Sequence, residues 1–135
     1  MIVVDNDVIS YFWLELASGR SETARRARRK DAEWVAPPLW RSEFRNVLRR
    51  YMQIGLMTYS EALWFAEKAE RDMRRHEYEV QTPDVLKLVE QTGHAAYDCQ
   101  YVTLAQSLGV PLVTGDQPIV EAFPDTAVLL EDFAG

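Results

Sequence analysis

Four acidic residues stand at points of the chain where their carboxylates could act on one substrate: Asp5, Glu43, Asp98 and Asp116. Converging carboxylates repel and raise one another's pKa unless a cation lies between them. Oxygen ligands without His or Cys favour a hard ion such as Mg²⁺ or Mn²⁺, which positions phosphate oxygens and lowers the pKa of water. The four residues therefore predict a metal site suited to phosphate chemistry.

The elements that must position these acids follow from the pattern of apolar residues. Strands are expected where short apolar runs meet a breaker: Met1–Val4, Trp34–Ala36, Tyr78–Val80, Val110–Thr114 and Ala127–Leu130. Helices are expected where apolar residues recur at helical spacing: Val8–Leu16, Ser21–Ala32, Leu39–Met52, the segment after the capping box Thr58–Glu61, Thr82–Gln91, His94–Ser107 and Ile119–Phe123.

Alternating strands and helices predict an α/β fold, with a central parallel sheet of about four to five short strands flanked by helices. At 135 residues, one domain over 1–135 is expected. In such a sheet the carboxyl ends of strands and the amino ends of helices share one edge. The predicted topology therefore brings all four acids to that edge. Each acid alone could instead be a helix cap or favour a helix dipole.

Composition excludes several other classes of protein. No apolar run is long enough to cross a membrane, and Met1–Asp5 lacks the basic region of a signal peptide, so a cytoplasmic protein is expected. Cys99 is the only cysteine, which excludes a disulfide framework and a cysteine-based zinc site. The net charge of −6 is the wrong sign for a protein that simply coats nucleic acid, although 14 of the 15 Lys and Arg residues fall in the first 75.

The ordered motifs resemble those of the PIN-domain ribonucleases, in particular the VapC toxins of prokaryotic toxin–antitoxin pairs. The matching segments are Val3-Val4-Asp5, Pro37-Pro38-Leu39, Glu43–Leu48, Tyr97–Tyr101 and Leu108–Asp116. The resemblance implies a single PIN-like nuclease domain in which Asp5, Glu43, Asp98 and Asp116 form the acidic metal-binding quartet and Thr114 is a polar neighbour. It also implies Mg²⁺-dependent RNA cleavage, homodimers and inhibition by an antitoxin.

Asp7 departs from the family pattern, which usually has a small hydroxyl residue two positions after the first Asp. A fifth acid could contact the metal or begin the first helix as its N-cap, and we favour the cap.

Two other functions remain open at this point. Asp5 and Asp7 resemble the nucleophile and the acid/base of haloacid-dehalogenase-like phosphatases, but the second acid of that family's late motif is absent after Asp116 and only Lys87 follows residue 68. A non-catalytic PIN-like module that binds RNA or protein is the other alternative.

Two expectations concern partners. Arg41 and Arg45 bracket Glu43 in sequence and are expected to contact RNA near the scissile phosphate. Trp13, Trp40, Trp64 and Phe65 are more bulky side chains than the early helices can easily bury. Some of them are expected to form an apolar patch that supports a homodimer and accepts an antitoxin segment.

Overall fold

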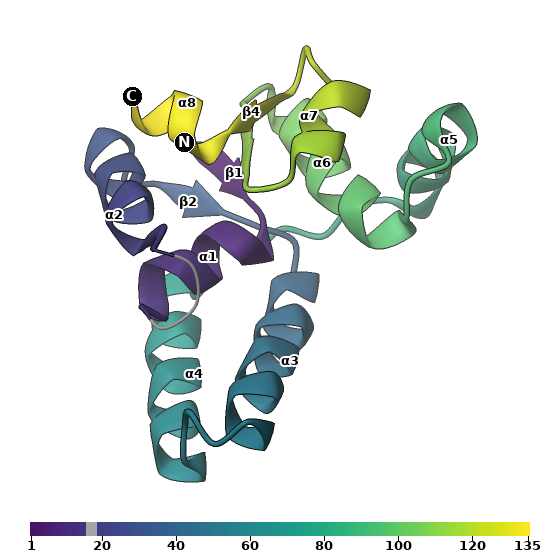
Figure 1. Ribbon diagram of the computed structural model, residues 1–135. Coiled ribbons are helices and arrows are strands. Elements are labelled where there is room, and N and C mark those ends of the chain that lie inside the picture. The colour runs from purple at the N-terminus through teal and green to yellow at the C-terminus, as the bar shows by residue number, and fades with distance from the viewer. Residues whose placement is uncertain (16–18) are drawn as a thin grey trace.

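The computed structural model describes residues 1–15 and 19–135, and four short parallel strands form the centre of this part of the chain (Figure 1). The strands lie in the order β2-β1-β3-β4. Their bounds are β1 (Ile2–Val4), β2 (Trp34–Val35), β3 (Leu112–Thr114) and β4 (Ala127–Leu129). Val and Leu dominate them, and β1, β2 and β3 are buried throughout, as expected for parallel strands covered on both faces.

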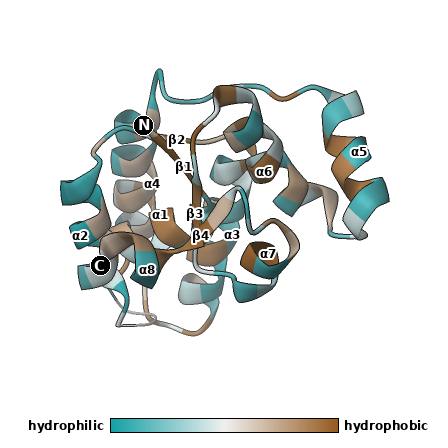
Figure 2. Ribbon diagram, turned by 90° about the horizontal axis from the view of Figure 1, so that it is seen from above, coloured by the Kyte–Doolittle hydropathy of each residue, from teal (hydrophilic) through white to brown (hydrophobic). Residues whose placement is uncertain are grey.

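Helices cover the sheet on both faces (Figures 1 and 2). The described helices are α1 (Asn6–Trp13), α2 (Ser21–Lys30), α3 (Leu39–Gln53), α4 (Tyr59–Met73), α5 (Thr82–Thr92), α6 (Ala96–Leu108), α7 (Gln117–Ala122) and α8 (Leu130–Ala134). On one face lie α1, α2 and α8, whereas α6 covers the other and α5 packs outside α6. The pair α3 and α4 extends beyond the carboxyl ends of the strands.

The position of β1 creates a crevice at one edge of the sheet. Val3 of β1 pairs with Val35 of β2 on one side and with Leu112 of β3 on the other. The chain leaves β1 toward β2 and later crosses back to β3, so the connections diverge between β1 and β3. In open α/β sheets ligands bind outside the carboxyl ends of the strands at such a switch point.

The predicted α/β fold with a parallel sheet is confirmed, and most helices lie within two residues of their expected ends. The strand expected at Tyr78–Val80 is wrong, since only an isolated bridge between Ala36 and Glu77 forms there. The helix α8 was not predicted. The first helix ends at Trp13, and the expected end at Leu16 lies outside the described residues.

The aromatic core holds α3 and β2 in place. Trp34, Trp40 and Phe44 are almost completely buried, and the Trp40 indole Nε1 donates to Glu77 Oε2 at 2.7 Å. The capping box at α4 forms as predicted, with Thr58 and Glu61 each bonding the other's backbone. In the described part of the chain, no helix combines the length and apolar character needed to span a bilayer.

Candidate active site

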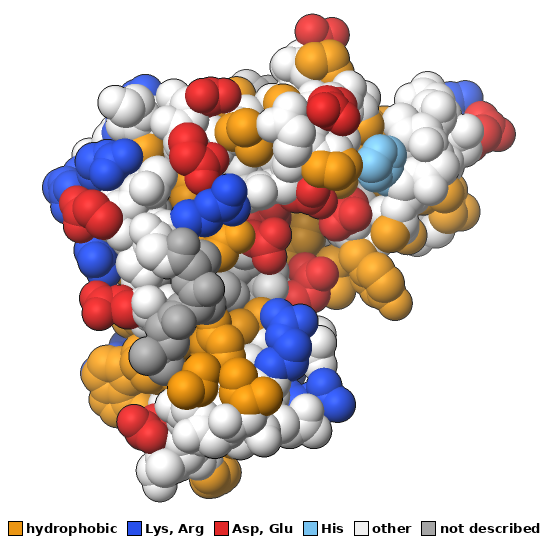
Figure 3. All heavy atoms as spheres, in the orientation of Figure 1, with side chains coloured by type: hydrophobic (Ala, Val, Ile, Leu, Met, Phe, Trp, Pro, Cys, Tyr) orange, Lys and Arg blue, Asp and Glu red, His pale blue; other side chains and the backbone are white. Residues whose placement is uncertain are grey.

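A small pocket at the carboxyl edge of the sheet brings the four predicted acids together. It encloses about 70 Å³ and is lined by Asp5, Asn6, Asp7, Glu43, Asp98, Tyr101 and Asp116. The predicted four arrive from separate places in the fold: the end of β1, the second turn of α3, the first turn of α6 and the turn after β3. Acidic side chains gather in this hollow above α3, and basic side chains lie on α3 directly beneath (Figure 3).

Asp5 is held by hydrogen bonds to both of its carboxylate oxygens. Oδ1 accepts from the Val8 backbone N–H at 3.0 Å, so Asp5 is the N-cap of α1, and Oδ2 accepts from the Thr114 hydroxyl. Burial, with the nearby charge of Asp7, raises the pKa of Asp5 to about 7, although these two hydrogen bonds oppose the rise. The carboxylate is therefore fixed in orientation, at a place where burial disfavours its charged form.

Thr114, the last residue of β3, links this strand by a side-chain hydrogen bond to Asp5 at the end of β1. Its side chain is fully buried, and besides donating to Asp5 its hydroxyl accepts from the Asp116 backbone N–H at 3.0 Å. The residue expected to be a polar neighbour of the site thus contacts one acid directly and the backbone of another.

Glu43 is held by a tyrosine from a distant helix. The Tyr101 hydroxyl on α6 donates to Glu43 Oε1 at 2.5 Å. Burial raises the pKa of Glu43, and Asp98 adds to the rise while the Tyr101 hydrogen bond opposes it. From the sequence, Tyr101 is only one member of the apolar stripe of α6. Helical periodicity predicts which face is buried, but it does not predict that the Tyr101 hydroxyl bonds Glu43.

Asp98 and Asp116 complete the predicted four. Burial raises the pKa of Asp98, and the charge of Asp116 raises it further. Asp116 occupies the N-cap position of α7 but its side chain makes no capping hydrogen bond. Its carboxylate lines the pocket instead.

The favoured interpretation of Asp7 as an N-cap is wrong, because Asp5 caps α1 and Asp7 lies within the first turn. This turn directs Asp7 into the same pocket as a fifth acid. Burial and the charge of Asp116 raise the pKa of Asp7, whereas Arg20 and Arg50 lower it. Asp7 is thus the acid of the pocket whose charge is partly offset by two arginine side chains, Arg20 and Arg50.

The donor set fits a hard divalent cation. The pocket offers carboxylate oxygens from five residues and no His or Cys. Burial, and after it the neighbouring carboxylates, raise the pKa values of Asp5, Asp7, Glu43 and Asp98, and a divalent cation would favour the charged form of each. Within residues 1–15 and 19–135, no three His, Cys, Asp or Glu side chains are placed as they stand to ligate one metal ion together, so the carboxylates would have to turn toward a cation. One carboxylate oxygen of Asp5 accepts a hydrogen bond from the Thr114 hydroxyl, and one of Glu43 accepts from the Tyr101 hydroxyl.

Arg41 and Arg45 do not reach this pocket. Arg41 Nε contacts Glu77 Oε2 at 2.7 Å and its Nη1 contacts Glu70 Oε1 at 2.9 Å, while Arg45 lies 3.6 Å from Glu70. Residues four apart share a face of a helix, whereas residues two apart point to nearly opposite sides. Although both arginines are close to Glu43 in sequence, they therefore face α4 and its following loop.

A larger groove of about 530 Å³ adjoins the acidic pocket and shares Asn6, Asp7 and Glu43 with it. Its other lining residues are Leu39, Ser42, Asn46, Val47, Arg50 and Tyr97. Sequence reasoning missed Arg50 and did not assign Tyr97 to a substrate groove. Counting helical turns from Glu43 would have found Asn46 and Arg50 on the same face of α3.

The bulky aromatic side chains divide between core and surface. Trp40 is fully buried, whereas Trp64 keeps 52% of its surface exposed. Trp64 forms one side of an apolar groove of about 430 Å³. The groove is lined by Phe12, Trp13, Leu14, Glu15, Leu56, Met57, Glu61, Trp64 and Phe65.

Comparisons with known proteins agree with this arrangement. Residues 2–122 match the family model described as PIN domain. Ribonuclease VapC3 of Pyrobaculum aerophilum is 32% identical over 129 residues, which cover 91% of this chain and 95% of that protein. Among solved structures, PAE2754 of Pyrobaculum aerophilum is similar with a TM-score of 0.76 and 19% identity, covering 98% of this chain and 92% of that one. FitAcB of Neisseria gonorrhoeae has a TM-score of 0.68 and 16% identity, covering 96% of both chains.

Proposed function

The chain belongs to the PIN domain family, and on this premise we propose that it is a VapC-type endoribonuclease that hydrolyses RNA phosphodiester bonds with the help of Mg²⁺ or Mn²⁺. One observation carries the mechanism: Asp5, Glu43, Asp98 and Asp116, from four separate elements, line a single pocket at the switch point of the sheet. Residues 1–135 are taken as one nuclease domain.

The four carboxylates would hold the cation, which supplies positive charge for the phosphate oxygens and acidifies water. Asp5 is oriented for this by Thr114 and by the amino end of α1, and Glu43 by Tyr101. The negative charges of Asp98 and Asp116 repel each other, and a cation bound between them would relieve this repulsion. Asp7 adds negative charge at the mouth toward the larger groove, where it would discourage phosphate unless a cation is bound.

Variants of the acids test this assignment. Asp98→Asn and Asp5→Asn keep the side-chain shape but remove one anionic ligand, and each should lower RNA cleavage by at least ~10²-fold, the range seen when one strong electrostatic element is removed. Asp125→Asn changes an exposed acid outside the pocket and serves as the matched control. Full cleavage by either site variant, or by the parent protein in EDTA, would show that the acids are not the metal ligands.

The same assay separates the two alternatives. A phosphatase that used Asp5 as nucleophile would release phosphate from small phosphorylated molecules. The two hydrogen bonds on the Asp5 carboxylate and the absence of a lysine among the residues that line the pocket favour the nuclease. A non-catalytic binding module would bind RNA without cutting it at any metal concentration.

An antitoxin is the expected protein partner of a VapC-type toxin. We propose in addition that the chain forms a homodimer and that it acts on RNA in the cytoplasm. The partly exposed Trp64 and the apolar groove beside it support a protein contact on this surface.

A further inference from the structure

The groove beside the acidic pocket is placed to receive the chain of a bound RNA, and this inference rests on the proposed nuclease function. The groove and the pocket share three lining residues, Asn6, Asp7 and Glu43. A strand whose scissile phosphate lies at the acids therefore continues into the groove without crossing a wall of protein.

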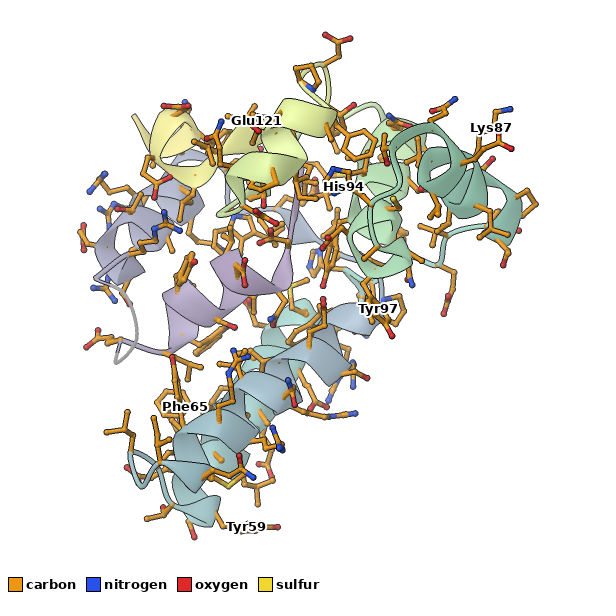
Figure 4. All side chains as sticks on the ribbon, turned by 45° about the vertical axis from the view of Figure 1, so that its right-hand side comes forward. Tyr59, Phe65, Lys87, His94, Tyr97 and Glu121 are labelled. Carbon is orange, nitrogen blue, oxygen red and sulfur yellow. The ribbon has the colours of Figure 1, made fainter. Side chains whose placement is uncertain are left out.

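Tyr97 offers the groove an aromatic surface. It is the second residue of α6, directly before Asp98, and 62% of its surface is exposed. Figure 4 shows Tyr97 at the end of α6 that approaches α3. Bases of single-stranded nucleic acid stack on exposed aromatic rings of this kind.

The opposite wall of the groove comes from one face of α3. Ser42 and Asn46 present a hydroxyl and an amide, groups that can hydrogen-bond to a base edge. Arg50 lies seven residues beyond Glu43 on the same face, roughly 10 Å along the helix axis. Its planar guanidinium can donate two hydrogen bonds to a phosphate, and its positive charge lowers the pKa of Asp7.

We propose that this groove is the subsite for the nucleotide next to the scissile phosphate, with the base stacked on Tyr97 and the adjoining phosphate at Arg50. The base must leave its own stack to reach Tyr97, so the subsite takes unpaired RNA. In a duplex the bases stay inside the helix and only backbone and groove edges are presented.

Binding measurements with three ligands test the proposal: an unpaired oligoribonucleotide, an abasic oligomer of equal length, and the same sequence annealed to its complement. Binding is measured with Mg²⁺ in an Asp116→Asn background, which slows hydrolysis without altering the residues that line the groove. Tyr97→Ala should weaken binding of the unpaired RNA by about 5- to 100-fold, as expected for the loss of one stacked base. It should leave the abasic oligomer unaffected, and Tyr97→Phe should restore binding.

Arg50→Gln should weaken the unpaired and the abasic oligomers alike and reduce the salt dependence, because it removes a phosphate contact. Two controls are matched by chemistry. Tyr59→Ala removes a tyrosine that is 68% exposed at the start of α4, away from the groove (Figure 4). Arg49→Gln removes the neighbouring arginine, which does not line the groove.

The proposal is overturned if Tyr97→Ala binds unpaired RNA as tightly as Tyr59→Ala does, or if it weakens the abasic oligomer equally. Tighter binding of the duplex than of the unpaired strand would also overturn it. Cleavage of RNA by the parent protein is recorded in parallel. If the parent cuts RNA while these binding results fail, the subsite is wrong and the nuclease function stands, whereas a parent that neither binds nor cuts RNA overturns both.

Discussion

The Tyr101 hydroxyl donates a hydrogen bond of 2.5 Å to Glu43 Oε1, across 58 positions of sequence. Tyr101 is buried in α6, and Glu43 extends from α3 on the far side of the pocket. The bond engages one oxygen of the carboxylate and leaves the other for a cation. A residue that packs in the core therefore also sets the orientation of an acid in the site.

Replacing Tyr101 with Phe should reduce metal affinity more than it reduces stability. Without the hydroxyl, Glu43 is no longer held toward the pocket, and we expect about a 10-fold higher Mn²⁺ concentration for half-maximal RNA cleavage. The Mn²⁺-induced rise in Tm, measured without RNA, should shrink in parallel. Tyr51→Phe alters another buried tyrosine that does not line the pocket and should change neither quantity. Unchanged metal dependence in Tyr101→Phe would show that the hydrogen bond is only structural.

The free energy of unfolding without divalent cations should fall as pH rises from about 4 to above 7. The folded protein holds the Asp5 proton up to a pKa of about 7, while the unfolded chain releases it near 3.8. Between these values the folded state binds more protons, so stability decreases with pH. We expect a loss on the order of 4 kcal/mol, measured by urea unfolding at several pH values.

Asp5→Asn should remove much of that pH dependence, whereas Asp125→Asn should keep it. Mg²⁺ or Mn²⁺ should restore more stability at pH 8 than at pH 5.5, because the cation competes with protons for the same carboxylates. A parent protein whose stability rises steadily from pH 4 to pH 8 would contradict the raised pKa of Asp5.

Arg41 should matter for folding and not for RNA. Its guanidinium bonds Glu77 through Nε and Nη2, at 2.7 and 2.9 Å, and Glu70 through Nη1. Arg41→Gln should lower the free energy of unfolding by about 1–3 kcal/mol, because charge-assisted hydrogen bonds in a partly buried network are lost. At a temperature where the variant is folded, it should cut RNA at the parent rate.

Arg45→Gln is the comparison for that variant. Arg45 is 58% exposed and lies 3.6 Å from Glu70, so its loss should cost less than about 1 kcal/mol. Urea unfolding and RNA cleavage across a salt series measure both variants. Weaker and less salt-dependent RNA binding in the Arg41/Arg45 double variant would instead restore these arginines as phosphate contacts.

Self-association should depend on Trp64. If the apolar groove beside Trp64 is the dimer contact, Trp64→Glu should weaken self-association at least ~10-fold, since buried aromatic anchors dominate interfaces. Sedimentation of the parent and the variant at micromolar concentrations measures this. Leu86→Glu alters a residue on α5 that is similarly exposed, at 55%, and should leave the parent state unchanged. A parent that sediments as one copy would exclude the homodimer.

Sequence patterns predicted the elements and the meeting of Asp5, Glu43, Asp98 and Asp116 because both follow from short-range periodicity and sheet topology. They could not predict side-chain partners across the fold. Whether an arginine near Glu43 faces the pocket depends on the rotation of α3, which its apolar residues fix against the core.

The same limit explains two other differences. Glu77 is part of no motif in the sequence, yet its carboxylate accepts hydrogen bonds from Arg41 and Trp40, which lie 36 and 37 positions earlier in the chain. Asp5 and Asp7 both lie at the start of the same helix, so the sequence alone does not show which of them is its N-cap. Only the backbone geometry, with Asp5 accepting from Val8, decides between them.

The order of the strands also bears on how the protein is made. β1 emerges first from a ribosome, but β3, its neighbour in the sheet, is synthesised more than a hundred residues later. The hydrogen bond from Thr114 to Asp5, and the one from the Asp116 backbone to Thr114, can form only after these later residues have been synthesised. A growing chain therefore cannot assemble the acidic pocket until residue 116 has left the ribosome, so the first strand and its acid stay without their partners while the helices between β1 and β3 are made.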